Sequence, residues 1–170
     1  NSNPDLEKTY KWSLDVNSAV ANIVRNVPPF PYVKESLVKM KEKADSIVVS
    51  QTPIEALERE WEEQNIAQYV HLIAGQEMGT KTEHIGMAAG GKYPSEKMLM
   101  IGDAPGDLKA ARENDALFFP VNPGNEEASW QQFYDEALDK FFNGTYAGSY
   151  EEKLIDTFHR YLPEKPPWEK

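Results

Sequence analysis

Residues 98–107 read MLMIGDAPGD, and this stretch decides the expected fold of the chain. The apolar run Met98–Ile101 has the length and composition of a buried β-strand. Two carboxylates, Asp103 and Asp107, follow at once, where a helix is expected to begin. In an open α/β fold such a loop lies at the carboxyl edge of the sheet, and carboxylate oxygens there suit a hard cation such as Mg²⁺. The alternative is that both acids only cap the helix and favour its dipole.

Composition indicates one folded domain and disfavours several classes of function. The chain has 170 residues, 40% of them hydrophobic, and a net charge of −10, which is unfavourable for binding a nucleic-acid backbone. It has no cysteine, so disulfides, zinc–thiolate sites and thiol nucleophiles are excluded. Its apolar stretches are far shorter than the roughly 20 residues of a membrane helix, and its first residues do not resemble a signal peptide. We therefore expect a cytoplasmic protein without membrane or nucleic-acid partners, and Asn1 in place of Met suggests a processed or truncated product.

Four apolar runs alternate with helical patterns along the middle of the chain. The strands are expected at 46–50, 69–74, 98–101 and 117–121, and the intervening helices at 52–64, 80–91 and 108–114. Two of these helices begin with capping boxes, Thr52–Glu55 and Thr80–Glu83. Strands alternating with helices through short connections predict an α/β fold with a doubly wound parallel sheet.

Helical segments are expected on both sides of this region. Apolar residues at helical spacing predict two helices before the first strand, the first with Asp15 as its N-cap. The apolar positions of that first helix are Val16, Val20, Ile23, Val24 and Val27. After the last strand, an aromatic stripe at 130–142 and a capped pattern from Ser149 predict C-terminal helices, which the prolines from Pro163 onward end. We divide the chain into a helical cap remnant or linker at 1–44 and an α/β core with C-terminal helices at 45–170.

Polar side chains stand where three of the expected strands end. Ser50 ends the first strand and Lys81 opens the helix after the second. Asp103 and Asp107 follow the third. Because the carboxyl ends of parallel strands lie at one edge of a sheet, a hydroxyl, an ammonium and two carboxylates are expected to converge there. Phosphoryl transfer uses this set of groups.

Each of these residues also has a plainer interpretation. Ser50 could only satisfy the backbone near Thr52, and Lys81 could be a solvated residue of a first helical turn. A cation is mildly unfavourable at a helix N-terminus, which favours a further role for Lys81. Lys92 and Lys97 compete for that role, but they fall closer to the acidic loop in sequence.

With these residues in this order, the chain resembles the haloacid dehalogenase superfamily of phosphohydrolases over roughly 47–124. Ile47–Ser50 is similar to the second motif of the family, and Lys81 to the third. Gly102–Asp107 is similar to the fourth motif, and Phe119–Gly124 to the last core strand and its loop. The resemblance implies a Rossmann-like core with the strands in a doubly wound sheet.

The resemblance also implies a Mg²⁺-dependent phosphomonoester hydrolase that acts through an aspartyl-phosphate. The substrate it implies is a small phosphorylated metabolite. Ser50 and Gln51 would bind the transferring phosphoryl group, and Lys81 would steady the charge of the nucleophile and of the phosphate. Asp103 and Asp107 would hold Mg²⁺.

One departure from the family concerns the nucleophile. The first family motif is an apolar strand ending in Asp-x-Asp, and this chain has no Asp-x-Asp. Its nearest approach, Leu14–Asn17, follows no apolar strand. We therefore expect the C-terminal part of a longer phosphatase, inactive by itself. Without that central strand, the remaining strands either close up or the gap is filled by the missing N-terminal segment or by another copy of the chain.

Three other functions use a similar set of residues. A non-catalytic relative that keeps the phosphate or metal site only for binding remains an alternative. A phosphoacceptor receiver domain is rejected, because its acidic pair would precede the hydroxyl and the lysine. A haloacid dehalogenase proper is disfavoured, because that chemistry does not need the Mg²⁺ pair.

Overall fold

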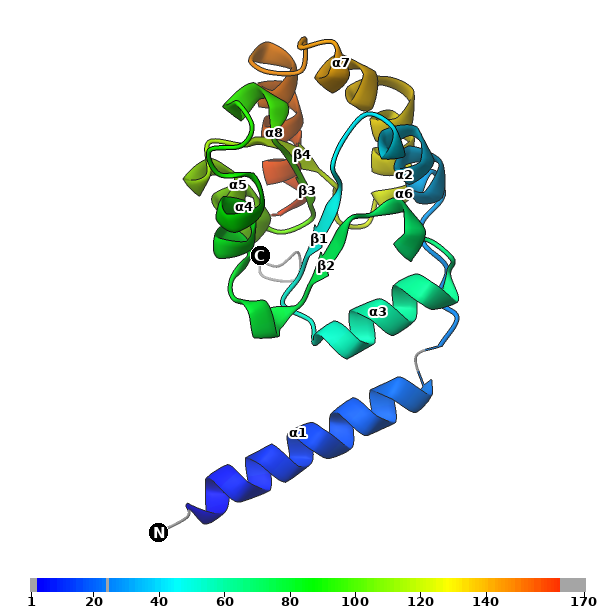
Figure 1. Cartoon of the computed structure of the whole chain (residues 1–170), viewed down its shortest axis with the longest axis vertical. Coiled ribbons are helices and arrows are strands. Elements are labelled where there is room, and N and C mark those ends of the chain that lie inside the picture. Colours follow the sequence, from blue (N-terminus) through cyan, green and yellow to red (C-terminus); the bar gives the residue numbers. More distant parts are fainter. Residues whose placement is uncertain (1–2, 24, 163–170) are drawn as a thin grey trace, which may run out of the picture.

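A computed structural model describes residues 3–23 and 25–162 (Figure 1). The strands are β1 (Ile47–Val49), β2 (Leu72–Ala74), β3 (Leu99–Gly102) and β4 (Leu117–Pro120). The helices are α1 (Pro4–Ile23), α2 (Val33–Lys41), α3 (Ile54–Glu63), α4 (Lys81–Ala89), α5 (Pro105–Glu113), α6 (Glu126–Gln132), α7 (Leu138–Phe142) and α8 (Ser149–Tyr161). Short helical turns are η1 (Ala67–Tyr69), η2 (Gln76–Met78), η3 (Ser95–Lys97) and the π-helical η4 (Phe133–Ala137).

The four strands form two separate parallel pairs. β1 pairs with β2, with Ile47 opposite Leu72, and β3 pairs with β4, with Leu99 opposite Leu117. The predicted α/β class is therefore confirmed, but one continuous doubly wound sheet is not seen among the described residues. β1 and β3 do not close up, because a cavity of about 980 Å³ lies between them, lined by 47–49 and 99–101.

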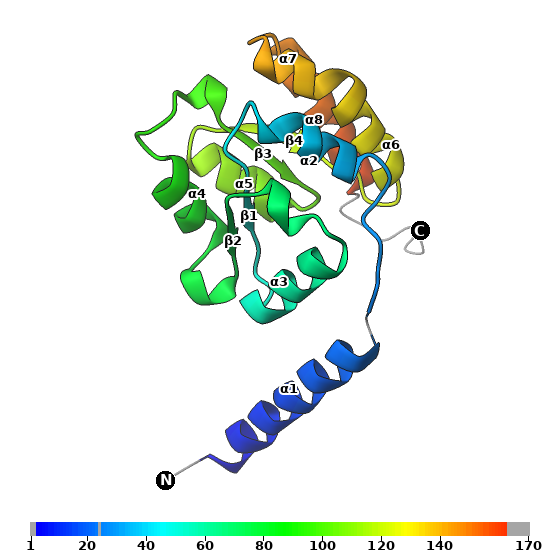
Figure 2. The ribbon, with the colours of Figure 1, turned by 45° about the vertical axis from the view of Figure 1, so that its right-hand side comes forward.

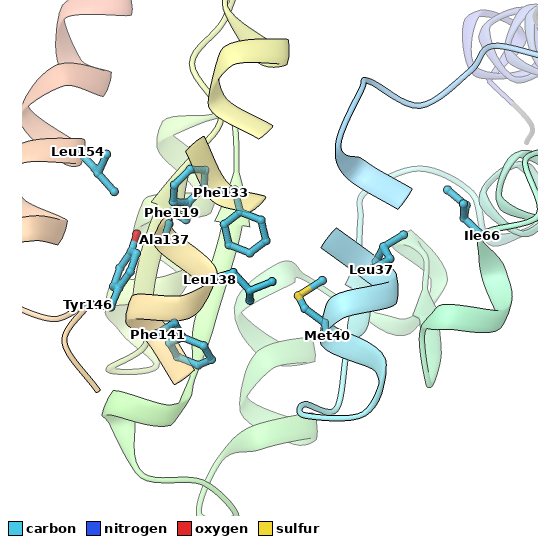
Figure 3. Packing of buried hydrophobic residues seen from close by; sticks show 10 residues of the cluster. All are labelled: Leu37, Met40, Ile66, Phe119, Phe133, Ala137, Leu138, Phe141, Tyr146 and Leu154. Atoms are coloured by element: carbon cyan, nitrogen blue, oxygen red, sulfur yellow. The ribbon is translucent and has the colours of Figure 1, made fainter. Parts of the chain in front are cut away.

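Helices cover both faces of the β3–β4 pair. Phe119 belongs to a buried cluster that includes side chains of α2, η4 and α7, and Figure 3 shows it beside Phe133 of η4. Its neighbour Phe118 points to the opposite face and packs among side chains of α4, α5 and α8. Figure 2 shows the same layers, with α4 and α5 on one side of the strands and α2 and α6 on the other. By contrast, Ile47–Val49 of β1 are only half-buried, although so apolar a run predicts a strand covered on both faces.

The outer edge of β4 is closed by side chains rather than by another strand. The Phe118 N–H donates to Glu151 Oε1 at 2.8 Å, and the Tyr146 hydroxyl donates to the Phe118 carbonyl at 2.8 Å. Pro120 has no N–H to satisfy. Burial raises the pKa of Tyr146 well above its ordinary value, which keeps the phenol protonated as a donor. Arg112 pairs with the buried Glu151 at 3.2 Å and compensates its charge. The outward backbone groups of β4 at Phe118 are thus satisfied by side chains, and we call this a finished edge.

The structure confirms one predicted capping box and corrects the other. Thr80 and Glu83 form both reciprocal bonds at the start of α4. α3 instead begins at Ile54, and its N-cap residue, Pro53, provides no side-chain cap. The first N–H of the helix, that of Ile54, donates to Glu77 Oε2 at 3.1 Å. Thr52 lies one residue before Pro53, the N-cap of α3. Its N–H donates to Ser50 Oγ, and its carbonyl accepts from the Gln76 N–H.

The N-terminal segment differs from its expected limits. α1 begins at Pro4 rather than after Asp15, and the Asp5 N–H donates to Asn3 Oδ1 at 3.0 Å. Figures 1 and 2 show α1 projecting away from the rest of the chain. α2 packs into the core through Leu37 and Met40, and the boundary between 44 and 45 stays a prediction. Val24 and residues 163–170, with their prolines, lie outside the described residues.

No described helix combines the length and the apolar character needed to cross a membrane.

Replacing Tyr146 by Phe is expected to destabilise the protein. The substitution leaves the buried carbonyl of Phe118 without a partner, and the free energy of unfolding should fall by about 1–3 kcal/mol. Urea unfolding monitored by circular dichroism measures the change. Tyr150→Phe is the matched control, because the Tyr150 hydroxyl bonds an exposed Glu136 carboxylate, and it should cost less than about 0.5 kcal/mol. Equal losses in the two variants would contradict the edge-closing role of Tyr146.

Candidate functional site

The buried carboxylate of Asp107 organises the loop that follows β3. Its Oδ2 accepts the backbone N–H groups of Asp103 and Ala104, each at 3.1 Å. Its Oδ1 lies 2.5 Å from the Lys81 ammonium. The Asp107 side chain is 2% exposed, so the positive charge of Lys81 is needed to offset the cost of burying it. The helix-capping interpretation of Asp107 is therefore correct, and the ion pair to Lys81 adds to it.

Gly102 makes this arrangement sterically possible. A Cβ at position 102 would lie 2.4 Å from both the Cβ and the Oδ2 of Asp107, closer than any real contact. Asp107 folds back over the end of β3 into the space where that side chain would stand. A glycine is thus required at position 102, because the Asp107 side chain lies too close to the backbone there for any Cβ.

Lys81 is the cation that reaches the acidic loop. It is the first residue of α4, whose start is held by the Thr80–Glu83 capping box. Hydrogen bonds from Thr80, first from its backbone and then from its hydroxyl, lower the pKa of Glu83 and keep this cap ionised. The competing candidates Lys92 and Lys97 precede β3 and so belong to the opposite end of that strand.

A second contact ties the loop after β1 to the segment before Lys81. The Gln51 side-chain amide donates to the Gly79 carbonyl at 3.0 Å. Ser50 Oγ accepts the Thr52 N–H at 3.1 Å, as its plainer interpretation predicted, and its hydroxyl hydrogen has no partner among the described residues. Together, the Gln51–Gly79 and Lys81–Asp107 contacts join the loops that follow β1, β2 and β3.

Asp103 is the exposed carboxylate of this group of loops. Its backbone N–H bonds Asp107, but its own carboxylate has no partner among the described residues. The described residues contain no group of three or more His, Asp or Glu placed to hold a metal ion. With both oxygens of Asp107 engaged, Asp103 is the carboxylate open to a cation. Mg²⁺ commonly takes one or two carboxylates together with phosphate oxygens and water, so these residues fit Mg²⁺ bound jointly with a phosphate.

Two residues that shape the site were not found from the sequence. Glu77 accepts the first N–H of α3 from a distant turn. Gly75 follows β2, and a Cβ there would lie 2.7 Å from the Ile54 nitrogen. A glycine directly after an apolar strand is the signal that could have indicated this close approach.

Comparison of the chain with protein-family models, with curated proteins and with solved structures gave no match.

Gly102→Ala should destabilise the protein and disturb the acidic loop. The new methyl group must displace the Asp107 side chain, at a cost of about 1–3 kcal/mol. Gly106→Ala, in the same loop, meets no atom within 4 Å and should leave stability unchanged or raise it by up to about 1 kcal/mol. Thermal unfolding of both variants tests the difference. A Gly102→Ala protein as stable as the Gly106→Ala protein would contradict the close packing.

Lys81 and Asp107 should show strong energetic coupling. Lys81→Met leaves a buried carboxylate without its cation, and the free energy of unfolding should fall by about 1–3 kcal/mol. Adding Asp107→Asn should recover part of the loss in a double-mutant cycle. The exposed Lys109–Glu113 pair, 3.7 Å apart, is the control, and its cycle should give less than about 0.5 kcal/mol. Additive effects of the Lys81 and Asp107 substitutions would show that the pair is not coupled.

Proposed function

We propose that the loops after β1, β2 and β3 bind the phosphoryl group of a small phosphorylated metabolite together with Mg²⁺, as part of a phosphomonoester hydrolase similar to the haloacid dehalogenase superfamily. The observation that carries this proposal is the pair of contacts that joins the three loops, Gln51 with Gly79 and Lys81 with Asp107. These contacts connect segments distant in sequence, and each segment holds a residue whose chemistry suits a phosphate.

Each residue has a defined part in the proposal. The Ser50 hydroxyl and the Gln51 backbone N–H donate to phosphoryl oxygens, since the Gln51 side chain already bonds Gly79. Lys81 supplies positive charge, and Asp107 fixes the ammonium in place. Asp103 takes Mg²⁺ directly, with Asp107 behind it. When bound, Mg²⁺ offsets the negative charge of the phosphoryl group.

The same proposal treats the two parallel pairs as halves of one doubly wound sheet. Support comes from the parallel pairing within each pair, from the Lys81–Asp107 contact that joins the loops after β2 and β3, and from the cavity that separates β1 from β3. The nucleophile is absent from these 170 residues, which have no Asp-x-Asp. We therefore expect the 170-residue chain to bind phosphate without turning over a phosphomonoester.

A non-catalytic binding protein is the second candidate function. It is favoured by the engagement of Asp107, which leaves Asp103 as the single open carboxylate of the site in the described part of the chain. The two candidates share a phosphate site and differ in whether an added nucleophile produces turnover.

Titration with inorganic phosphate tests the shared site. We expect Mg²⁺-dependent shifts of the backbone amide signals of Gln51, Asp103 and Gly106 in ¹H–¹⁵N NMR spectra. Asp103→Asn should lower the phosphate affinity measured with Mg²⁺ by about tenfold or more. Asp115→Asn is the matched control, because it removes the same charge from an exposed residue that precedes β4, at the opposite end of the strands.

Two results would contradict the proposed site or the expected lack of turnover. Phosphate binding that ignores both Mg²⁺ and the Asp103 substitution would overturn the proposed site. Hydrolysis of para-nitrophenyl phosphate by the 170-residue chain would overturn the expectation that its nucleophile is absent.

A further inference from the structure

The side-chain oxygen of Asn122 is buried without a hydrogen-bond partner. Asn122 is 8% exposed, and its Oδ1 meets no donor within the described residues 3–23 and 25–162. A buried carbonyl oxygen that gives up its hydration and gains no donor is costly, so such groups are few in folded proteins. An oxygen of this kind indicates a position built to contact an ion, a ligand or water.

The backbone of Asn122, in contrast, is hydrogen-bonded on both sides. The Asn122 N–H donates to Ser129 Oγ at 3.0 Å, and the Asn122 carbonyl accepts the Asn125 N–H at 2.9 Å. Ser129 Oγ in turn donates to the Asn125 carbonyl at 2.9 Å. The main chain of the loop is therefore held in place, and the unpartnered oxygen stands on a fixed support. Such preorganisation lowers the cost of ordering when the oxygen binds.

Asn122 follows β4 at the same end of the strands as the acidic loop. Pro120 pairs with Gly102, and the Val121 N–H donates to the Gly102 carbonyl at 2.8 Å. Val121 is thus the residue opposite Asp103, and Asn122 is the next along the chain. Because paired strands lie about 5 Å apart, the loop after β4 leaves the sheet beside the loop that carries Asp103. It adds a fourth loop to those that follow β1, β2 and β3.

The chemistry of the Asn122 oxygen matches Mg²⁺ rather than phosphate. A carbonyl oxygen accepts hydrogen bonds or binds a hard cation, whereas phosphoryl oxygens are acceptors themselves. Of the two ligands proposed for this edge, hydrated Mg²⁺ is therefore the one that offers a partner, through the ion or through a water that the ion holds. The amide oxygen is also neutral, so it joins the Asp103 carboxylate at the cation without adding negative charge beside a phosphate.

We propose that Asn122 Oδ1 is the second protein oxygen of the Mg²⁺ site and binds the hydrated ion together with the Asp103 carboxylate. This inference rests on the proposed function, because it names a further residue of the same site. It gives the loop after β4 a part in binding, and it leaves Asp107 as the residue that holds the acidic loop and Lys81 in place.

Asn122→Leu in the 170-residue chain separates a ligand role from a structural one. The substitution keeps the approximate shape of the side chain and removes the buried oxygen. In Mg²⁺ titrations at fixed inorganic phosphate, followed by the amide signals of Asp103 and Gly106, the apparent Mg²⁺ affinity should fall by about tenfold or more. The midpoint of thermal unfolding without Mg²⁺ should stay the same or rise, because no buried acceptor is left unsatisfied. Loss of a merely structural side chain would lower that midpoint instead.

A second variant and a paramagnetic ion test the same contact. Asn122→Asp keeps an oxygen at this position, so its Mg²⁺ affinity should be at least that of the unsubstituted chain. When Mn²⁺ replaces Mg²⁺ in the titration, the Asn122 side-chain amide signals should broaden together with the backbone amide signal of Asp103. The side-chain amide signals of Asn114, which follows the other end of α5, should broaden far less.

Asn125→Leu is the matched control for the loop. Asn125 lies three residues after Asn122, and its side-chain amide donates to the hydroxyl of the exposed Tyr161 at 3.3 Å. Because this amide has a partner of its own, its removal should leave the Mg²⁺ affinity unchanged.

Four results would overturn the inference. Mg²⁺-dependent phosphate binding that is weakened by Asp103→Asn but not by Asn122→Leu would exclude the Asn122 contact and leave the proposed function standing. A lower unfolding midpoint for Asn122→Leu would show that the side chain is structural. Equal weakening by Asn122→Leu and Asn125→Leu would show that binding depends on the loop as a whole and not on the Asn122 oxygen. An unsubstituted chain without Mg²⁺-dependent phosphate binding would overturn both this inference and the proposed function.

Discussion

A buried peptide group must have a hydrogen-bond partner, and this constraint decides where each sheet of the structure can end. At the outer edge of β4 the constraint is met by α8 and the turn before it, because Glu151 and Tyr146 bond both sides of Phe118. Pro120 removes the next donor from the same edge. No such device protects the inner edges of β1 and β3 within the described residues. The contrast between a finished edge and two unfinished ones indicates that β4 is built to end the sheet and that β1 and β3 are not.

In the acidic loop, too, one side chain satisfies several polar groups. One carboxylate, that of Asp107, satisfies two backbone donors and the ammonium of Lys81, and it does so because Gly102 leaves room for it. The loop geometry and the position of the cation therefore depend on a single buried side chain. Asp103 is left exposed, with its carboxylate directed to no partner in the described chain. The structural role of Asp107 and the ligand role proposed for Asp103 are complementary, since Asp107 fixes the loop that carries Asp103.

Local patterns predicted the elements well and their assembly less well. Each of the four strands and the helices between them overlaps the segment that its apolar run or capping box indicated, because these signals act within a few residues. The limits differ, since β2 begins at Leu72 rather than at 69 and α5 begins at Pro105 rather than at 108. The convergence of Lys81 with Asp107 followed from the parallel direction of the strands. The cap of α3 was wrong because its acceptor, Glu77, comes from a turn after the next strand. The gap between β1 and β3 and the side-chain closure of β4 depend on contacts between distant segments, which periodicity does not encode.

The unfinished edges and the candidate site are linked through β1 and β3. Ile47–Val49 are only half-buried, and their inward peptide groups lack partners, so β1 is held by β2 and by a few helical contacts. Any strand that binds between β1 and β3 therefore adds stability in proportion to its concentration and its affinity. It also fixes the spacing of the two strands whose ends carry Ser50 and Asp103. A phosphate held between those two residues would bind more tightly once that spacing is fixed, because less freedom is then lost on binding. By reciprocity, phosphate at the loops would favour the inserted strand by the same factor.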